Sequence, residues 1–132
     1  MTLVLADTSV WMRQDQAAVA ERLADTVEEG TAATTMPIAL EILRSSRDAR
    51  DARATADELN ALPRIPITDW VERRARNVLL ALAWRGYHRG PSAVDLLAAA
   101  AAESVDAELW HCDRHFELIG EITGQPMRRV GT

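Results

Sequence analysis

The sequence contains no lysine, a single cysteine and no apolar run longer than residues 96–102. The absence of lysine excludes a Schiff-base lysine, a phosphate-binding P-loop lysine and a Ser–Lys dyad. The single cysteine, Cys112, excludes an internal disulfide framework and a zinc cluster built from several cysteines. The apolar runs are far shorter than the about 20 residues that a membrane-spanning helix needs. Without a positively charged leader segment, the chain is expected to be cytoplasmic and to have no membrane partner.

Acidic residues outnumber basic ones by 20 to 15, which gives a net charge of −5, and every basic residue is arginine. A net-negative protein is not held to nucleic acid by bulk charge. Binding to nucleic acid would therefore require a local arginine patch or a bound metal ion. The length of 132 residues and the hydrophobic content of 48% predict a single folded domain, residues 1–132.

Short β-favouring segments alternate with segments of helical periodicity along the whole chain. We expect strands at residues 2–6, 31–35, 64–67, 108–112 and 127–130. Helices are expected at residues 7–29, 36–45, 47–62, 69–86, 92–102 and 113–122. Pro66 limits the third strand to an edge position or to a brief piece, and Asp69 with Glu72 is expected to form the capping box of the helix that follows. This alternation predicts an α/β fold, a three-layer α/β/α sandwich with a mainly parallel central sheet.

Four carboxylates occupy positions where an ionised group is costly or functional. Asp7 and Asp113 each follow a predicted strand, Asp95 lies in the first turn of an apolar helix, and Glu41 has apolar neighbours in its helix. Parallel strands end at a common sheet edge, which is where such folds bind ligands. Purely structural roles remain open as alternatives to ligand binding. The aspartates are suitable helix caps, and Glu41 can pair with Arg44 in solvent.

Carboxylates without a cysteine or histidine cluster favour a metal ion that prefers oxygen ligands. Mg²⁺ fits this set, and Mn²⁺ is a suitable substitute. Two such ions about 4 Å apart would clamp the attacking and leaving oxygens of a phosphodiester. Bound metal would also offset the repulsion between an acidic protein and a polyanionic substrate.

Four short motifs in this order resemble those of the PIN domains of the VapC toxin type. They are Leu5-Ala-Asp-Thr-Ser-Val-Trp11, Pro37 with Glu41-Ile-Leu43, His88-Arg-Gly-Pro-Ser-Ala-Val-Asp95, and Asp113-Arg-His-Phe-Glu117. Each motif is weak alone, but the four together extend over essentially the whole chain.

The resemblance implies a metal-dependent endoribonuclease, the toxin of a type II toxin–antitoxin pair. By the same resemblance, Asp7, Glu41, Asp95 and Asp113 are the catalytic and metal-binding acids. Hydrolysis of the RNA phosphodiester by a metal-activated water would leave a 5′-phosphate and a 3′-hydroxyl. The expected partners are an RNA substrate, a VapB-like antitoxin and a second copy of the chain in a homodimer.

The chain departs from the family pattern at His115, where these proteins often carry a further acid. The imidazole is either a contact to metal or phosphate, or a surface helix residue. Ser9, Arg89 and Arg114 are further candidates for substrate binding. Each also has an ordinary structural interpretation, Ser9 as a helix cap and the arginines as solvated side chains.

Two other α/β classes place acids at strand ends but do not fit this sequence. A receiver domain requires a lysine, and a haloacid-dehalogenase-like phosphatase requires an aspartate at the position of Ser9. A non-catalytic PIN-like binding domain, with the acids serving only as caps, remains the alternative to the nuclease.

Overall fold

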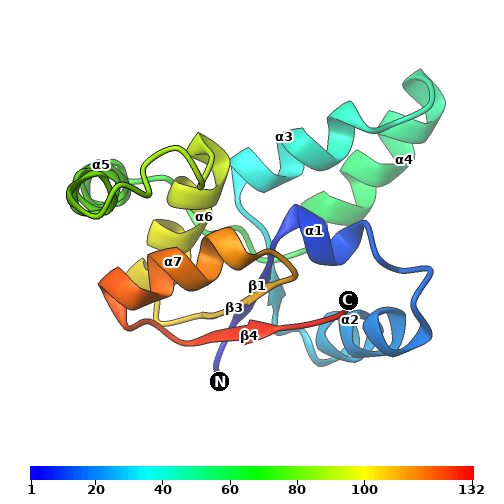
Figure 1. Cartoon of the computed structure of the whole chain (residues 1–132). Coiled ribbons are helices and arrows are strands. Elements are labelled where there is room, and N and C mark those ends of the chain that lie inside the picture. Colours follow the sequence, from blue (N-terminus) through cyan, green and yellow to red (C-terminus); the bar gives the residue numbers. More distant parts are fainter.

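A short-stranded, entirely parallel sheet forms the centre of the protein (Figure 1). The computed structural model describes all residues 1–132. The strand order in the sheet is β2-β1-β3-β4. The strands are β1 Val4–Ala6, β2 Ala32–Ala33, β3 Glu108–His111 and β4 Met127–Arg129. Each strand is followed by a helical connection, except for the last one, as the alternating sequence pattern predicts.

Seven helices surround this sheet and confirm the predicted α/β class. They are α1 Thr8–Trp11, α2 Ala17–Glu29, α3 Met36–Arg44, α4 Ala49–Asn60, α5 Asp69–Trp84, α6 Ala93–Ser104 and α7 Arg114–Thr123. None of them is both long and apolar enough to cross a membrane.

Neighbouring strands present matched residues to two separate cores, because successive side chains of a strand point to opposite faces. Leu5 pairs with Leu109, and both belong to the larger core, which also contains buried residues of α3, α5, α6 and α7. Ala6 pairs with Trp110 on the other face, where a smaller core includes Val19 and Leu23 of α2. Helices therefore cover both faces of the sheet, which confirms the sandwich architecture.

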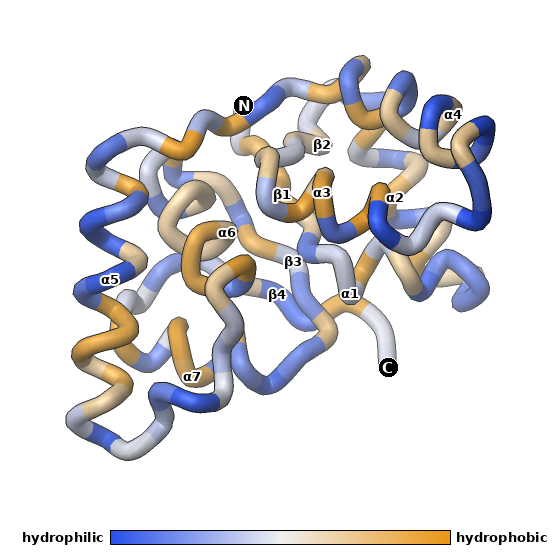
Figure 2. The backbone as a smooth tube through the Cα atoms, turned by 90° about the horizontal axis from the view of Figure 1, so that it is seen from above, coloured by the Kyte–Doolittle hydropathy of each residue, from blue (hydrophilic) through white to orange (hydrophobic).

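Helix α6 lies deepest in the protein. Its residues 98–102 are all alanine and all buried, and in Figure 2 the helix carries hydrophobic colours, whereas hydrophilic residues recur along α4. Small side chains let this helix lie close to its neighbours, so its first turn is held rigidly at the sheet edge. That turn carries Asp95.

Three local predictions were wrong. The expected helix 7–29 is two helices, because residues 13–16, all polar, have no apolar periodicity and the chain turns between residues 12 and 16. Residues 64–67 form no strand; only Arg64 makes a bridge, to Thr34, since Pro66 has no N–H to donate. The N-cap of α5 is Thr68, whose side chain accepts a hydrogen bond from Val71 N at 3.2 Å, rather than Asp69.

Candidate functional site

Asp7 lies at the carboxyl end of β1 and caps helix α1. Its Oδ2 accepts a hydrogen bond from the Ser9 N–H at 3.0 Å, whereas its buried Oδ1 has no partner. The side chain is only 4% exposed. Burial raises the pKa of Asp7 above its ordinary value, and the negative charge of Glu41 raises it further. This carboxyl is thus a buried acid with a free oxygen, a costly arrangement unless a cation or a proton compensates it.

Glu41 reaches Asp7 from helix α3 through a contact between two helices. The Thr8 hydroxyl donates a hydrogen bond to Glu41 Oε1 at 2.5 Å. Thr8 follows Asp7 directly in the chain, so this bond brings the two carboxylates near each other. The contribution of Glu41 to the pKa of Asp7 is consistent with this proximity.

Asp95 is fixed by a capping box at the start of α6. The Asp95 N–H donates to Ser92 Oγ at 3.1 Å, and the Ser92 N–H donates to Asp95 Oδ2 at 2.9 Å. Burial raises the pKa of Asp95, and the charges of Asp7 and Asp113 add to the increase. The capping role expected from the sequence is therefore confirmed, and it coexists with a position among other acids.

Asp113 follows β3 and caps helix α7, accepting a hydrogen bond from the His115 N–H at 2.9 Å. The His115 Nδ1 atom lies 3.4 Å from Asp113 Oδ1 and 4.0 Å from Asp95 Oδ2. One candidate ligand atom of each of these three residues lies within 4.8 Å of the others. His115 is therefore part of the acidic group and not an isolated surface residue.

The four carboxylates affect one another electrostatically, since the charge of Glu41 acts on Asp7 and the charges of Asp7 and Asp113 act on Asp95, but of the four only Asp95 and Asp113 belong to the close group with His115. Strands β1 and β3 are parallel neighbours, so Asp7 and Asp113 follow strands that end at the same edge of the sheet, and the other two acids lie on α3 and at the start of α6. The unpaired Asp7 Oδ1 and an otherwise oxygen-rich donor set fit a divalent cation that prefers oxygen ligands.

The three other candidate residues differ in their surroundings. Ser9 Oγ accepts a hydrogen bond from the Cys112 N–H at 3.1 Å and so ties the ends of β1 and β3 together. Arg114 directly follows Asp113, Arg89 lies in the loop six residues before Asp95, and both are exposed. Neither arginine takes part in an ion pair, so both side chains are free to meet a ligand.

Two residues of the site were not found from the sequence. Thr8 holds Glu41, and Gly90 packs against the His115 ring, where a Cβ atom would lie 3.2 Å from Cδ2. Thr8 is suggested only by its place beside Asp7. For Gly90 the sequence carries no signal, because the contact joins a loop to another helix.

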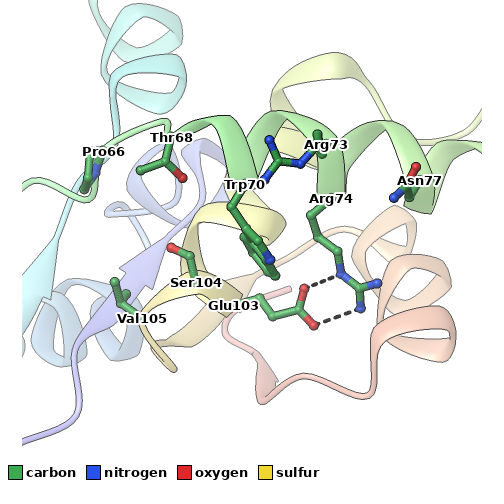
Figure 3. Close-up of a pocket in the computed structure, with 9 residues that line it drawn as sticks. All are labelled: Pro66, Thr68, Trp70, Arg73, Arg74, Asn77, Glu103, Ser104 and Val105. Carbon is green, nitrogen blue, oxygen red and sulfur yellow. Dashed lines mark hydrogen bonds and ion pairs between the residues drawn. The ribbon is translucent and has the colours of Figure 1, made fainter.

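Two surface hollows lie apart from the four acids. One, of about 750 Å³, lies at the far end of α6, and the Arg74–Glu103 ion pair crosses it (Figure 3). The second, of about 870 Å³, is lined by residues of α1 to α4, including Trp11, Leu23, Val27 and Ile42. We call this second hollow the α2–α4 groove.

A parallel α/β sandwich with several carboxylates at the carboxyl ends of its strands is suited to metal-dependent chemistry, including that of a nuclease domain. The sequence model of the PIN domain family matches residues 4–122, and the chain belongs to this family. Among its curated relatives, Ribonuclease VapC18 of Mycobacterium tuberculosis is 37% identical over 122 residues, which cover 91% of this chain and 89% of the relative. Ribonuclease VapC2 of the same species is 36% identical over 128 residues, which cover 96% of this chain and 91% of the relative.

Solved structures share the fold at lower identity. VapBC2 from Rickettsia felis, bound to a DNA fragment from its promoter, contains a chain with a TM-score of 0.78 at 15% identity, covering 98% of this chain and all of that one. A chain of VapBC-5 from Mycobacterium tuberculosis has a TM-score of 0.67 at 21% identity, and the match covers both chains completely. These similarities confirm the expected PIN-like fold.

Proposed function

We propose that this protein is a metal-dependent endoribonuclease and the toxin of a type II toxin–antitoxin pair that acts in the cytoplasm. The observation that carries the proposal is the group of four carboxylates at one sheet edge, with a buried and unpaired Asp7 oxygen. The relatives named VapC ribonucleases support the same activity.

Asp7, Glu41, Asp95 and Asp113 would hold the cation, with Mg²⁺ or Mn²⁺ as the fitting ions. When bound, the cation supplies Lewis acidity that activates water and neutralises charge on the phosphate. The buried Asp7 carboxylate would contribute its free oxygen; burial raises its pKa, and the nearby charge of Glu41 adds to the increase, a cost that a bound cation would offset.

The remaining side chains of the site hold the acids in place before substrate arrives. Thr8 fixes Glu41, Ser92 fixes Asp95, and Ser9 joins the two strand ends. Such preorganisation avoids rearrangement during the reaction. Arg89 and Arg114, both exposed and unpaired, would then contact RNA phosphates, which arginine binds well because its donors form a planar fork.

The α2–α4 groove would receive an apolar segment of a VapB-like antitoxin. Two of the helices that line the groove also hold acids of the site, because Trp11 belongs to the helix that Asp7 caps and Ile42 lies on the same helix as Glu41. One peptide can therefore fill the groove and bring an arginine to the carboxylates, a pairing with bidentate geometry. The VapBC titles of the solved relatives support this partner.

A homodimer is the second assembly that we propose. Leu80 and Trp84 lie one turn apart on α5, and they are 55% and 93% exposed. Large apolar side chains that share an exposed face often mark an interface. Sedimentation of the purified chain should give a dimer, and Trp84→Arg should shift it to a monomer. A wild-type monomer at micromolar concentration would contradict this part of the proposal.

The activity is tested on purified protein with a mixed RNA substrate. Cleavage should require Mg²⁺ or Mn²⁺, stop with chelator, and fall at least about 100-fold in Asp7→Asn and Asp95→Asn, as for loss of a group that stabilises transition-state charge. Asp57→Asn is the matched control, because Asp57 is exposed on α4 and has no bonding partner. Cleavage that persists in chelator, or is retained by Asp7→Asn, would contradict the metal site.

The toxin role is tested by expression in cells. The chain alone should arrest growth, and co-expression with a small VapB-like protein should restore it. If the folded, metal-loaded chain leaves growth and RNA intact, the non-catalytic PIN-like binding domain becomes the better explanation.

A further inference from the structure

The His115 ring faces Asp95 and Asp113, at a position where proteins of the family often carry a further acid. Its Nδ1 atom lies 3.4 Å from Asp113 Oδ1 and 4.0 Å from Asp95 Oδ2. Neighbouring ligands of an octahedral cation lie about 3 Å apart and opposite ligands about 4 Å, given metal–ligand bonds of about 2.1 Å. The nitrogen is therefore spaced from both carboxylates as a shared ligand would be.

The orientation of this ring is set by the loop that precedes α6. A Cβ atom at Gly90 would lie 3.2 Å from Cδ2 and 3.6 Å from Nε2 of His115. The glycine thus allows the ring edge that carries Nε2 to lie against the loop. The Nδ1 edge consequently stays turned toward Asp95 and Asp113.

A separate observation indicates that this group is built for a cation. Asp7 is 4% exposed, and its Oδ1 has no hydrogen-bond partner. Its charge acts on Asp95, which links it to the carboxylates beside His115. No arginine forms an ion pair with any of these acids, so the protein supplies no fixed positive partner for the charge.

We propose that His115 Nδ1 is a metal ligand together with Asp95 and Asp113, and that this nitrogen makes the site select Mn²⁺ over Mg²⁺. The inference rests on the proposed metal-dependent function. Mg²⁺ is bound almost entirely by oxygen, whereas Mn²⁺, although it also favours oxygen, is a first-row transition metal and accepts an imidazole nitrogen more readily than Mg²⁺ does.

The direct test is pulsed electron paramagnetic resonance of the full chain loaded with Mn²⁺ alone. A coordinated imidazole gives ¹⁴N modulation of the Mn²⁺ echo, and this readout does not depend on catalysis. We expect the modulation in the wild type, its loss in His115→Asp, and its retention in His88→Ala. His88 is the matched control because it is exposed in the loop and lies outside the acidic group. Labelling the wild-type histidines with ¹⁵N should replace the ¹⁴N signal, which tests the assignment to histidine without any variant.

Calorimetry of the same proteins measures the selectivity. The ratio of the Mg²⁺ to the Mn²⁺ dissociation constant should fall at least about tenfold in His115→Asp and stay unchanged in His88→Ala. Bound Mn²⁺ without nitrogen modulation, in a protein that still cleaves RNA, would overturn the role of His115 and leave the proposed function intact. Nitrogen modulation in a protein that never cleaves RNA would support His115 as a metal ligand and refute the proposed nuclease activity. Absence of both Mn²⁺ binding and cleavage would refute both.

Discussion

Replacing Asp7 by asparagine should stabilise the metal-free protein while it removes activity. The Asp7 carboxyl is buried, one oxygen lacks a partner, and burial raises its pKa. The asparagine amide still leaves a polar atom unpaired at this position, but it carries no charge, so the variant escapes the cost of burying an ionised carboxylate, which is about 1.4 kcal/mol for each unit by which burial raises the pKa. For a chain of this length, we expect the melting temperature to rise by about 3–10 °C.

The pH dependence of this gain follows from the direction of the pKa shift. Because the pKa of Asp7 in the folded protein lies above the ordinary value of 3.8, the folded state binds more protons than the unfolded state between these two values. The stability of the wild type therefore falls as the pH rises through this window. The advantage of Asp7→Asn should be absent below pH 3.8 and complete above the folded-state pKa.

Urea unfolding in chelator, at a series of pH values, measures this difference between the two proteins. Asp57→Asn is the control and should change the unfolding free energy by less than about 0.5 kcal/mol. Added Mn²⁺ should reverse the order, because it stabilises only a protein that binds it. An Asp7→Asn protein that is less stable than the wild type in chelator at pH 7 would refute the reasoning.

Three further predictions concern the scaffold that holds the site. Ser92→Ala removes the capping box of α6 and should cost about 1 kcal/mol in urea unfolding; an unchanged midpoint would contradict the cap. Arg74→Ala and Glu103→Ala each break a bidentate, part-buried ion pair and should each cost about 1 kcal/mol. The double variant should lose no more than the larger single loss, and full additivity would argue against coupling. Phe116→Ala empties a fully buried position and should cost about 3–5 kcal/mol by calorimetry, whereas a loss below 1 kcal/mol would place this ring outside the core.

The positions of the acids were predictable because each rests on a local pattern. Asp7 and Asp113 follow strands, and parallel strands end at one edge of a sheet. Ser92 and Asp95 have the spacing of a capping box, which the structure contains. These signals lie within a few residues of one another, so they depend little on tertiary context.

The features that the sequence did not reveal depend on contacts between distant segments. The Thr8–Glu41 bond joins residues 33 positions apart, and Gly90 meets His115 across two elements. The segment around Pro66 has strand-forming residues, but sheet pairing is decided by available N–H groups and neighbours. Thr68 and Asp69 are both good N-caps, and sequence preference alone does not distinguish them.

The most direct test of the central claim is mass spectrometry of the RNA ends produced in ¹⁸O-labelled water with Mn²⁺. The account predicts a 5′-phosphate on the downstream fragment that carries one ¹⁸O atom, and a 3′-hydroxyl on the upstream fragment, because water attacks the phosphorus. A 2′,3′-cyclic phosphate formed without ¹⁸O would show that the RNA's own 2′-hydroxyl is the nucleophile and would contradict the role given to the four carboxylates.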